Sequence, residues 1–179
     1  MTNISFDEFI NEQTKLATED SIDKDKELAQ WLDSVRDFYN KIEHFLERYI
    51  KDDKIKLKYE KQVLHEDFSG DYKIDALTLF IGSSQIHFKP IGTMLVGAKG
   101  RIDMTGPRGV VRFVLVRKDA SAPRISVRVV VNGQEPAAAL PTEQVAEWTW
   151  KISTPPPRVK YTELEEESFY TAMMEVAHG

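Results

Sequence analysis

The chain has 179 residues, of which 41% are hydrophobic and 30% are charged, and we expect one compact domain over residues 1–179. It contains no cysteine, which excludes a disulfide framework, a cysteine nucleophile and a thiolate metal site. The first residues lack the basic and apolar parts of a secretion signal, and no apolar run approaches the roughly 18 residues that cross a bilayer. We therefore expect a soluble, cytoplasmic protein that does not contact membranes.

Charge is segregated along the chain, although the net charge is only −5. Residues 1–54 carry a net charge of −6, residues 55–97 carry zero, residues 98–130 carry +6 and residues 131–179 carry −5. An acidic chain is a poor candidate for wrapping duplex nucleic acid, because that binding needs a broad basic surface. The basic middle third still permits a local basic patch.

The first segment, residues 5–50, is predicted to be helical. Ser5 and Glu8 have the spacing of a capping box, which indicates a short helix over about 6–17. Ser21 is the next candidate N-cap, and a long amphipathic helix is predicted to follow it. Its apolar face carries Leu28, Trp31, Leu32, Val35, Phe38, Tyr39, Ile42, Phe45, Leu46 and Tyr49. A face this wide favours packing onto a broad core over a narrow coiled-coil seam.

Residues 55–153 are predicted to form a curved, mostly antiparallel sheet of about seven strands. The apolar period changes to two after residue 54, and the connections are too short for helical crossovers. The expected strands cover about 55–60, 72–81, 85–89, 98–104, 110–116, 125–131 and 146–152. In the second of these, the change of phase between Ile74 and Leu77 indicates a bulge or a bend.

A C-terminal helix is predicted over residues 161–177, with Thr162 as its cap and a cluster of glutamates in its first turns. The three prolines at 155–157 form an extended spacer before it. The fold class is therefore α+β, in which the long helix lies across one face of the sheet. Trp31, Trp148 and Trp150 are expected to fill the contact between this helix and the sheet.

Several catalytic patterns are incomplete. The glycine-rich stretch Gly92–Lys99 has its lysine displaced by one residue, and a strand follows it, so it does not match a phosphate-binding loop. The four histidines are dispersed and no nucleophile elbow is present. The sequence thus predicts no catalytic residue, no metal ligand and no cofactor.

The segment from Asp103 to Lys118 resembles the Asp…Glu-x-Lys arrangement of metal-dependent nucleases in the restriction-endonuclease-like superfamily. The resemblance implies that Asp103 would hold a divalent cation and Lys118 would stabilise developing charge. Val116 stands where the second carboxylate belongs, so the cation would lose an anionic ligand. The resemblance therefore implies a degenerate site, and a surface Asp103 with a solvated Lys118 is the simpler interpretation.

The strongest functional candidate is a basic sheet face. Basic residues occupy the polar phases of neighbouring predicted strands, and the candidate binding residues are Lys99, Arg101, Arg112, Arg124 and Arg128. We expect a non-catalytic interaction or accessory protein whose basic face binds a protein partner, including another copy of the chain. Nucleic-acid binding through the same face is the alternative, although Phe88, Trp148 and Trp150 fall on inward phases. An enzyme acting on a small anionic ligand ranks third.

Overall fold

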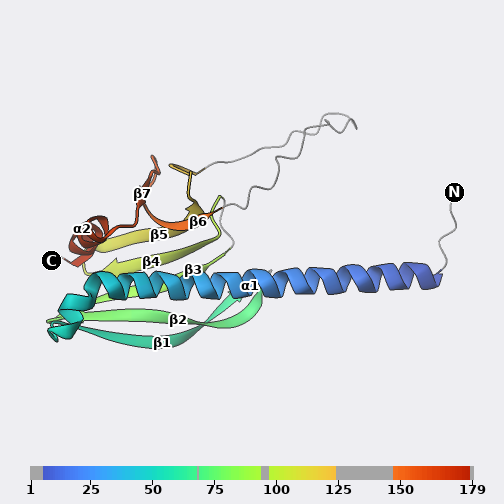
Figure 1. The fold of residues 1–179 in the computed structure, drawn as a ribbon, viewed down its shortest axis with the longest axis horizontal. Helices are drawn as coiled ribbons and strands as arrows, with labels where there is room; N and C mark the ends of the chain where they lie inside the picture. Colours follow the sequence, from blue (N-terminus) through green and yellow to red (C-terminus); the bar gives the residue numbers. More distant parts are fainter. Residues whose placement is uncertain (1–5, 68, 94–96, 124–146, 178–179) are drawn as a thin grey trace.

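The computed structural model describes residues 6–67, 69–93, 97–123 and 147–177, and its architecture is α+β (Figure 1). It comprises helix α1 (Phe6–Lys51), strands β1 (Ile55–Glu66), β2 (Gly70–Ile81), β3 (Ser84–Gly92), β4 (Gly100–Gly106), β5 (Gly109–Arg117), β6 (Trp148–Ser153) and β7 (Tyr161–Glu163), and helix α2 (Glu166–Ala177). The seven strands form one antiparallel sheet in sequence order, and the sheet does not close into a barrel. This confirms the predicted fold class.

Helix α1 is one continuous helix of 46 residues, so the predicted interruption between residue 17 and Ser21 is wrong. The stretch contains no glycine or proline, so nothing in it interrupts a helix. The possible N-cap at Ser21 is therefore not used, and the helix continues through it. The helix ends where Asp53 adopts a left-handed backbone conformation with φ of 54°. The amide of Lys54 then donates to the carbonyl of Tyr49, which closes the last turn.

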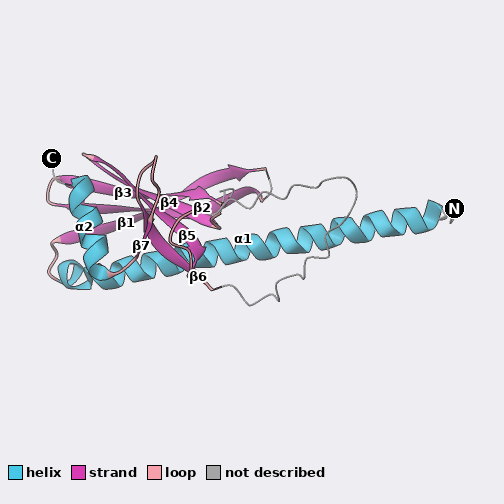
Figure 2. Ribbon diagram, turned by 90° about the horizontal axis from the view of Figure 1, so that it is seen from above, coloured by secondary structure: helices cyan, strands magenta, loops and turns pink. Residues whose placement is uncertain are grey.

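The two halves of α1 differ in their surroundings. From Trp31 onward its apolar face is buried against the sheet, whereas the N-terminal half extends past the strands (Figures 1 and 2). Phe6, Ile10 and Ile22 are 75%, 45% and 60% exposed. The N-terminal half of the helix is therefore a projecting arm, which we define as residues 6–27.

The sheet departs from the predicted strands at several points. Pairing of β1 with β2 runs without a shift from Gly70 to Ile81, so the change of burial phase after Ile74 reflects the twist of the hairpin rather than a bulge. The register shift lies instead between Pro90 and Gly92 in β3. The predicted strand over 125–131 lies outside the described residues.

Strand β7 occupies residues assigned by the prediction to the C-terminal helix. Thr162 pairs with Ile152 on β6, so its backbone belongs to the sheet and cannot cap a helix. Helix α2 starts at Glu166, and the Ser168 hydroxyl accepts a hydrogen bond from the amide of Glu165 at 3.0 Å. The helix therefore begins later than predicted, behind a short edge strand.

The core lies between the sheet and both helices. The ring of Phe38 on α1 lies 5.0 Å from the Phe113 ring on β5, and the Phe169 ring on α2 lies 6.4 Å from Phe113, measured between centroids. Trp31 and Trp150 are buried and their rings lie 6.0 Å apart, as predicted. Trp148 is 36% exposed, so its predicted place in the core is wrong. Since α1 and α2 pack on the same face, no described helix covers the opposite face.

Candidate functional site

The face of the sheet opposite the helices carries the predicted basic residues. The register aligns Lys89 on β3, Asp103 on β4 and Arg112 on β5 in one row across the sheet. Directly paired residues of antiparallel strands project from the same face, and the contact of Thr78 with His87 at 3.1 Å illustrates this on the neighbouring row. We call this side, over β1–β5, the outward face.

Arg101 and Asp103 form an ion pair on the outward face. Arg101 Nε lies 2.9 Å from Asp103 Oδ1, without the alignment of a hydrogen bond, and Nη2 donates to Oδ2 at 3.2 Å. The two side chains are 28% and 17% exposed, so most of each side chain is shielded from solvent. Arg112 Nε is buried and has no hydrogen-bond partner among the described residues.

The cluster around Asp103 has an excess of positive charge. Lys89 and Arg112 flank Asp103 across the strands, and Arg101 lies two residues away on the same strand. Three cations thus surround one carboxylate, which leaves a net charge of +2. Lys89 is exposed, so this excess positive charge is accessible to a partner. We call Lys89, Arg101, Asp103 and Arg112 the basic cluster.

The five predicted binding residues do not all belong to this cluster. Arg101 and Arg112 do, whereas Lys99 lies immediately before β4, and its ammonium is 4.6 Å from the centroid of the Trp148 ring. Arg124 and Arg128 lie outside the described residues. Lys89 was not among the candidates, although it occupies the polar phase of its predicted strand, and only the cross-strand register shows that it lies beside Asp103.

The outward face is closed at the β6 side. The Lys151 side chain is only 5% exposed, and its ammonium donates to the carbonyls of Lys118 at 2.8 Å and Ala120 at 3.0 Å. It also lies 2.5 Å from Glu163 Oε1. Lys151 therefore anchors the chain after β5 over the sheet, and Val116 on this side is fully buried. The accessible part of the outward face is limited to the strands before β6.

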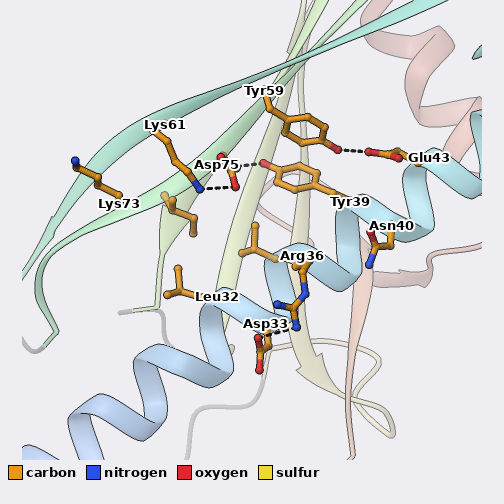
Figure 3. Close-up of a pocket in the computed structure, with 12 residues that line it drawn as sticks. Leu32, Asp33, Arg36, Tyr39, Asn40, Glu43, Tyr59, Lys61, Lys73 and Asp75 are labelled. Atoms are coloured by element: carbon orange, nitrogen blue, oxygen red, sulfur yellow. Dashed lines mark hydrogen bonds and ion pairs between the residues drawn. The ribbon is translucent and has the colours of Figure 1, made fainter.

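A charged groove lies on the helix side, between α1 and the β1–β2 hairpin (Figure 3). Its volume is about 430 Å³. The Tyr39 hydroxyl donates to the carbonyl of Asp75 at 2.8 Å, and the Tyr59 hydroxyl donates to Glu43 Oε1 at 2.5 Å. Lys61 pairs with the Asp75 carboxylate at 2.7 Å.

Burial raises the pKa of both groove tyrosines, and a neighbouring negative or ionisable group adds to the effect. For Tyr39 the second cause is Tyr59, and for Tyr59 it is the hydrogen bond to Glu43. Both phenols therefore remain protonated donors at neutral pH. Because the carboxylates of the groove bind partners within the chain, this arrangement holds the helix to the hairpin, and we assign it a structural role.

A second hollow, of about 450 Å³, adjoins the exposed face of Trp148. Gly97, Ala98, Arg117 and Ala122 contribute to its wall. Arg117 is held by Asp119, whose Oδ1 lies 3.1 Å from Arg117 Nε. The hollow therefore offers an aromatic surface beside the Lys99 cation, and it is separate from the basic cluster.

The elements of the nuclease-like pattern are dispersed. Lys118 follows β5 and its ammonium pairs with Glu147 Oε2 at 2.7 Å, and both side chains are 70% exposed. Six residues separate Lys118 from Arg112, the cross-strand partner of Asp103, which corresponds to about 20 Å of extended chain. Within the described ranges, no group of three or more histidine and carboxylate side chains is placed to hold a metal ion. Asp103 and Lys118 thus act in separate surface ion pairs.

Comparison of the chain with protein-family models, with curated proteins and with solved structures finds no match. In the part of the chain that the structure describes, no helix has a stretch long and apolar enough to cross a membrane.

Proposed function

We propose that the protein is a non-catalytic interaction protein whose outward face binds an acidic segment of a protein partner. The observation that supports this proposal is the basic cluster, in which three cations surround one carboxylate on a sheet face that no described helix covers. Electrostatic complementarity of this kind favours encounter with an acidic partner and selects against a basic one.

The rest of the outward face is suited to a protein surface. Val110 on β5, which lies beside the basic cluster, is 50% exposed and adds an apolar group to this polar face. A mixed surface with exposed apolar groups supplies the contact area that charged pairs alone lack, because exposed ion pairs contribute little affinity. An amphipathic acidic helix satisfies both requirements.

The experiment uses a fluorescein-labelled acidic amphipathic peptide of unrelated sequence and measures its fluorescence anisotropy as the full chain is added. The proposal predicts saturable binding that weakens with salt and at least tenfold loss of affinity in the double variant Lys89→Glu and Arg112→Glu. The matched control is Arg158→Glu with Lys160→Glu, which reverses the same charge in an exposed turn. Equal affinity of the two double variants, or no binding at all, would contradict the proposal.

Nucleic-acid binding is the second candidate, and one observation favours it. Trp148 is exposed beside Lys99, which is the combination of a stacking ring and a cation used for single strands. A labelled single-stranded oligonucleotide in the same assay separates the two candidates. This alternative predicts that the oligonucleotide binds and that Trp148→Ala abolishes the binding, whereas the favoured proposal predicts no saturable binding of the oligonucleotide.

A further inference from the structure

We propose that the acidic partner is a second copy of this chain, and that the projecting arm of each copy docks on the outward face of the other. This inference rests on the proposed function and identifies its partner. The arm and the outward face would then form a reciprocal dimer with two-fold symmetry, in which each copy contributes one arm and one face.

The described side chains of the projecting arm are not buried. Among the described side chains, Trp31 is the first buried one in α1, and those of the arm are exposed apart from a half-exposed Lys24. Most of the stability of a helix in a protein comes from the packing of an amphipathic face. Phe6 and Ile10 lie four residues apart, on one side of the helix, and are 75% and 45% exposed. They would provide the apolar contacts of a docked arm.

The charge of the arm selects its partner. Residues 6–27 contain three lysines and eight carboxylates, a net charge of −5. Two arms placed side by side would repel each other, so a symmetric pair of arms is disfavoured. The outward face is the complementary surface. Over β1–β5 it carries five cations and three carboxylates, a net charge of +2: Lys56, Lys58, Lys89, Arg101 and Arg112 against Glu60, Glu66 and Asp103.

A single copy cannot make this contact with itself. The arm continues the straight axis of α1, which packs on the opposite face of the sheet, so it points away from the molecule (Figure 1). To reach its own outward face, the helix would have to break and reverse, and its interior contains no glycine or proline. Only a second copy brings the acidic arm and the outward face together without refolding.

The dimensions agree with such a dimer. The 22 residues of the arm span about 33 Å at a rise of about 1.5 Å per residue. The accessible strands β1–β5, spaced about 4.8 Å apart, give a face about 19 Å wide, so one arm is long enough to cross it. A footprint about 10 Å wide covers roughly 190 Å² on each surface, and two reciprocal contacts bury about 760 Å² in total. This area corresponds to a weak, transient association rather than to a permanent dimer.

Sedimentation velocity of the full chain tests the proposal with a charge swap. The first variant, Lys89→Glu with Arg112→Glu, has a reversed face, and the second, Asp7→Lys with Asp25→Lys, has a reversed arm. We expect the unmodified chain to dimerise in a salt-sensitive manner and each variant alone to associate at least tenfold more weakly. An equimolar mixture should dimerise again, because each acidic arm then meets a basic face and each basic arm meets an acidic face.

Two results would overturn the proposal. One is a chain that stays monomeric at all concentrations at low salt, and the other is a mixture that associates no better than its separate components. The control Arg158→Glu with Lys160→Glu should dimerise like the unmodified chain. A chain that remains monomeric yet binds the unrelated acidic peptide would refute the dimer and leave the proposed function standing, whereas failure of both assays would refute both.

Discussion

Replacing Gly100 by alanine should loosen the contact between α1 and β4. A Cβ atom at this position would lie 2.1 Å from Cζ3 and 2.6 Å from Cε3 of the Trp31 ring. That ring is 2% exposed, and its Nε1 donates to the Tyr72 hydroxyl at 3.0 Å. The ring therefore cannot yield without losing either its packing or its hydrogen bond.

The magnitude follows from three contributions. Overpacking costs about 1 to 3 kcal/mol, and loss of the Trp31 hydrogen bond costs about 1 kcal/mol. The lower entropy of alanine in the unfolded chain offsets about 0.4 to 1 kcal/mol. We expect a net loss of about 1 to 3.6 kcal/mol in the free energy of unfolding, which corresponds to a fall in Tm of about 2 to 14 °C for a chain of this size.

Urea and thermal denaturation followed by circular dichroism measure this change. Gly109→Ala is the matched control, because a Cβ there meets no atom within 4 Å, and its effect should stay within about 0.5 kcal/mol. The double variant Gly100→Ala with Trp31→Phe should be less destabilised than the sum of its parts, since the smaller ring relieves the clash. A Gly100→Ala protein as stable as Gly109→Ala, or strict additivity in the double variant, would refute the reasoning.

Three further predictions concern stability. Gly106→Ala should lower Tm in a thermal melt more than Gly109→Ala does, because its Cβ would lie 2.4 Å from the backbone carbonyl oxygen of Val176 on α2; equal melting temperatures would show that α2 does not pack there. Lys151→Met should lower the free energy of unfolding by about 2 kcal/mol in urea denaturation, since it leaves the carbonyls of Lys118 and Ala120 without their donor. It should also speed amide hydrogen exchange at residues 118–120. Unchanged exchange would show that Lys151 does not hold this segment on the sheet. Burial raises the pKa of Tyr170 to about 12, with its hydrogen bond to Glu166 as the second cause. Above pH 10 the phenol ionises in the unfolded chain, whereas it stays protonated in the folded chain up to about pH 12, so the free energy of unfolding should fall between about pH 10 and 12. Tyr170→Phe should reduce this pH dependence when unfolding is measured across that range. An unchanged pH dependence would contradict the assignment.

The sequence predicted the elements whose signal is local and repetitive. Alternation over Lys99–Met104 and the wide apolar face from Leu28 to Tyr49 correspond to β4 and to the packed half of α1. The capping signal at Ser21 misled, because a cap adds about 1 kcal/mol and does not end a helix that contains no breaker. Thr162 misled for a related reason, since pairing with β6 outweighs its capping propensity.

The sequence predicted that the site is a basic sheet face, but it did not predict all of the residues that form it. The alternation of apolar and polar residues placed Arg101 and Arg112 on the polar side of their strands. The position of Lys89 beside Asp103 depends instead on how the strands are paired, which the alternation within one strand does not determine. Lys151 alternates with the apolar Trp150 and Ile152, a pattern that favours an exposed lysine, yet it is buried because the chain after β5 folds back and supplies carbonyl acceptors. Such contacts depend on where the segments between strands run over the sheet, and the alternation of apolar and polar residues within a strand does not reveal this.

The most direct measurement of the central claim is the reactivity of Lys89 towards acetylation in the unmodified chain, followed by mass spectrometry as protein concentration rises. If the arm of a second copy docks on the outward face, Lys89 should become protected over the concentrations at which the chain dimerises, and Lys160 should react equally throughout. High salt should restore the reactivity of Lys89. A Lys89 that reacts as readily as Lys160 at every concentration would contradict the claim.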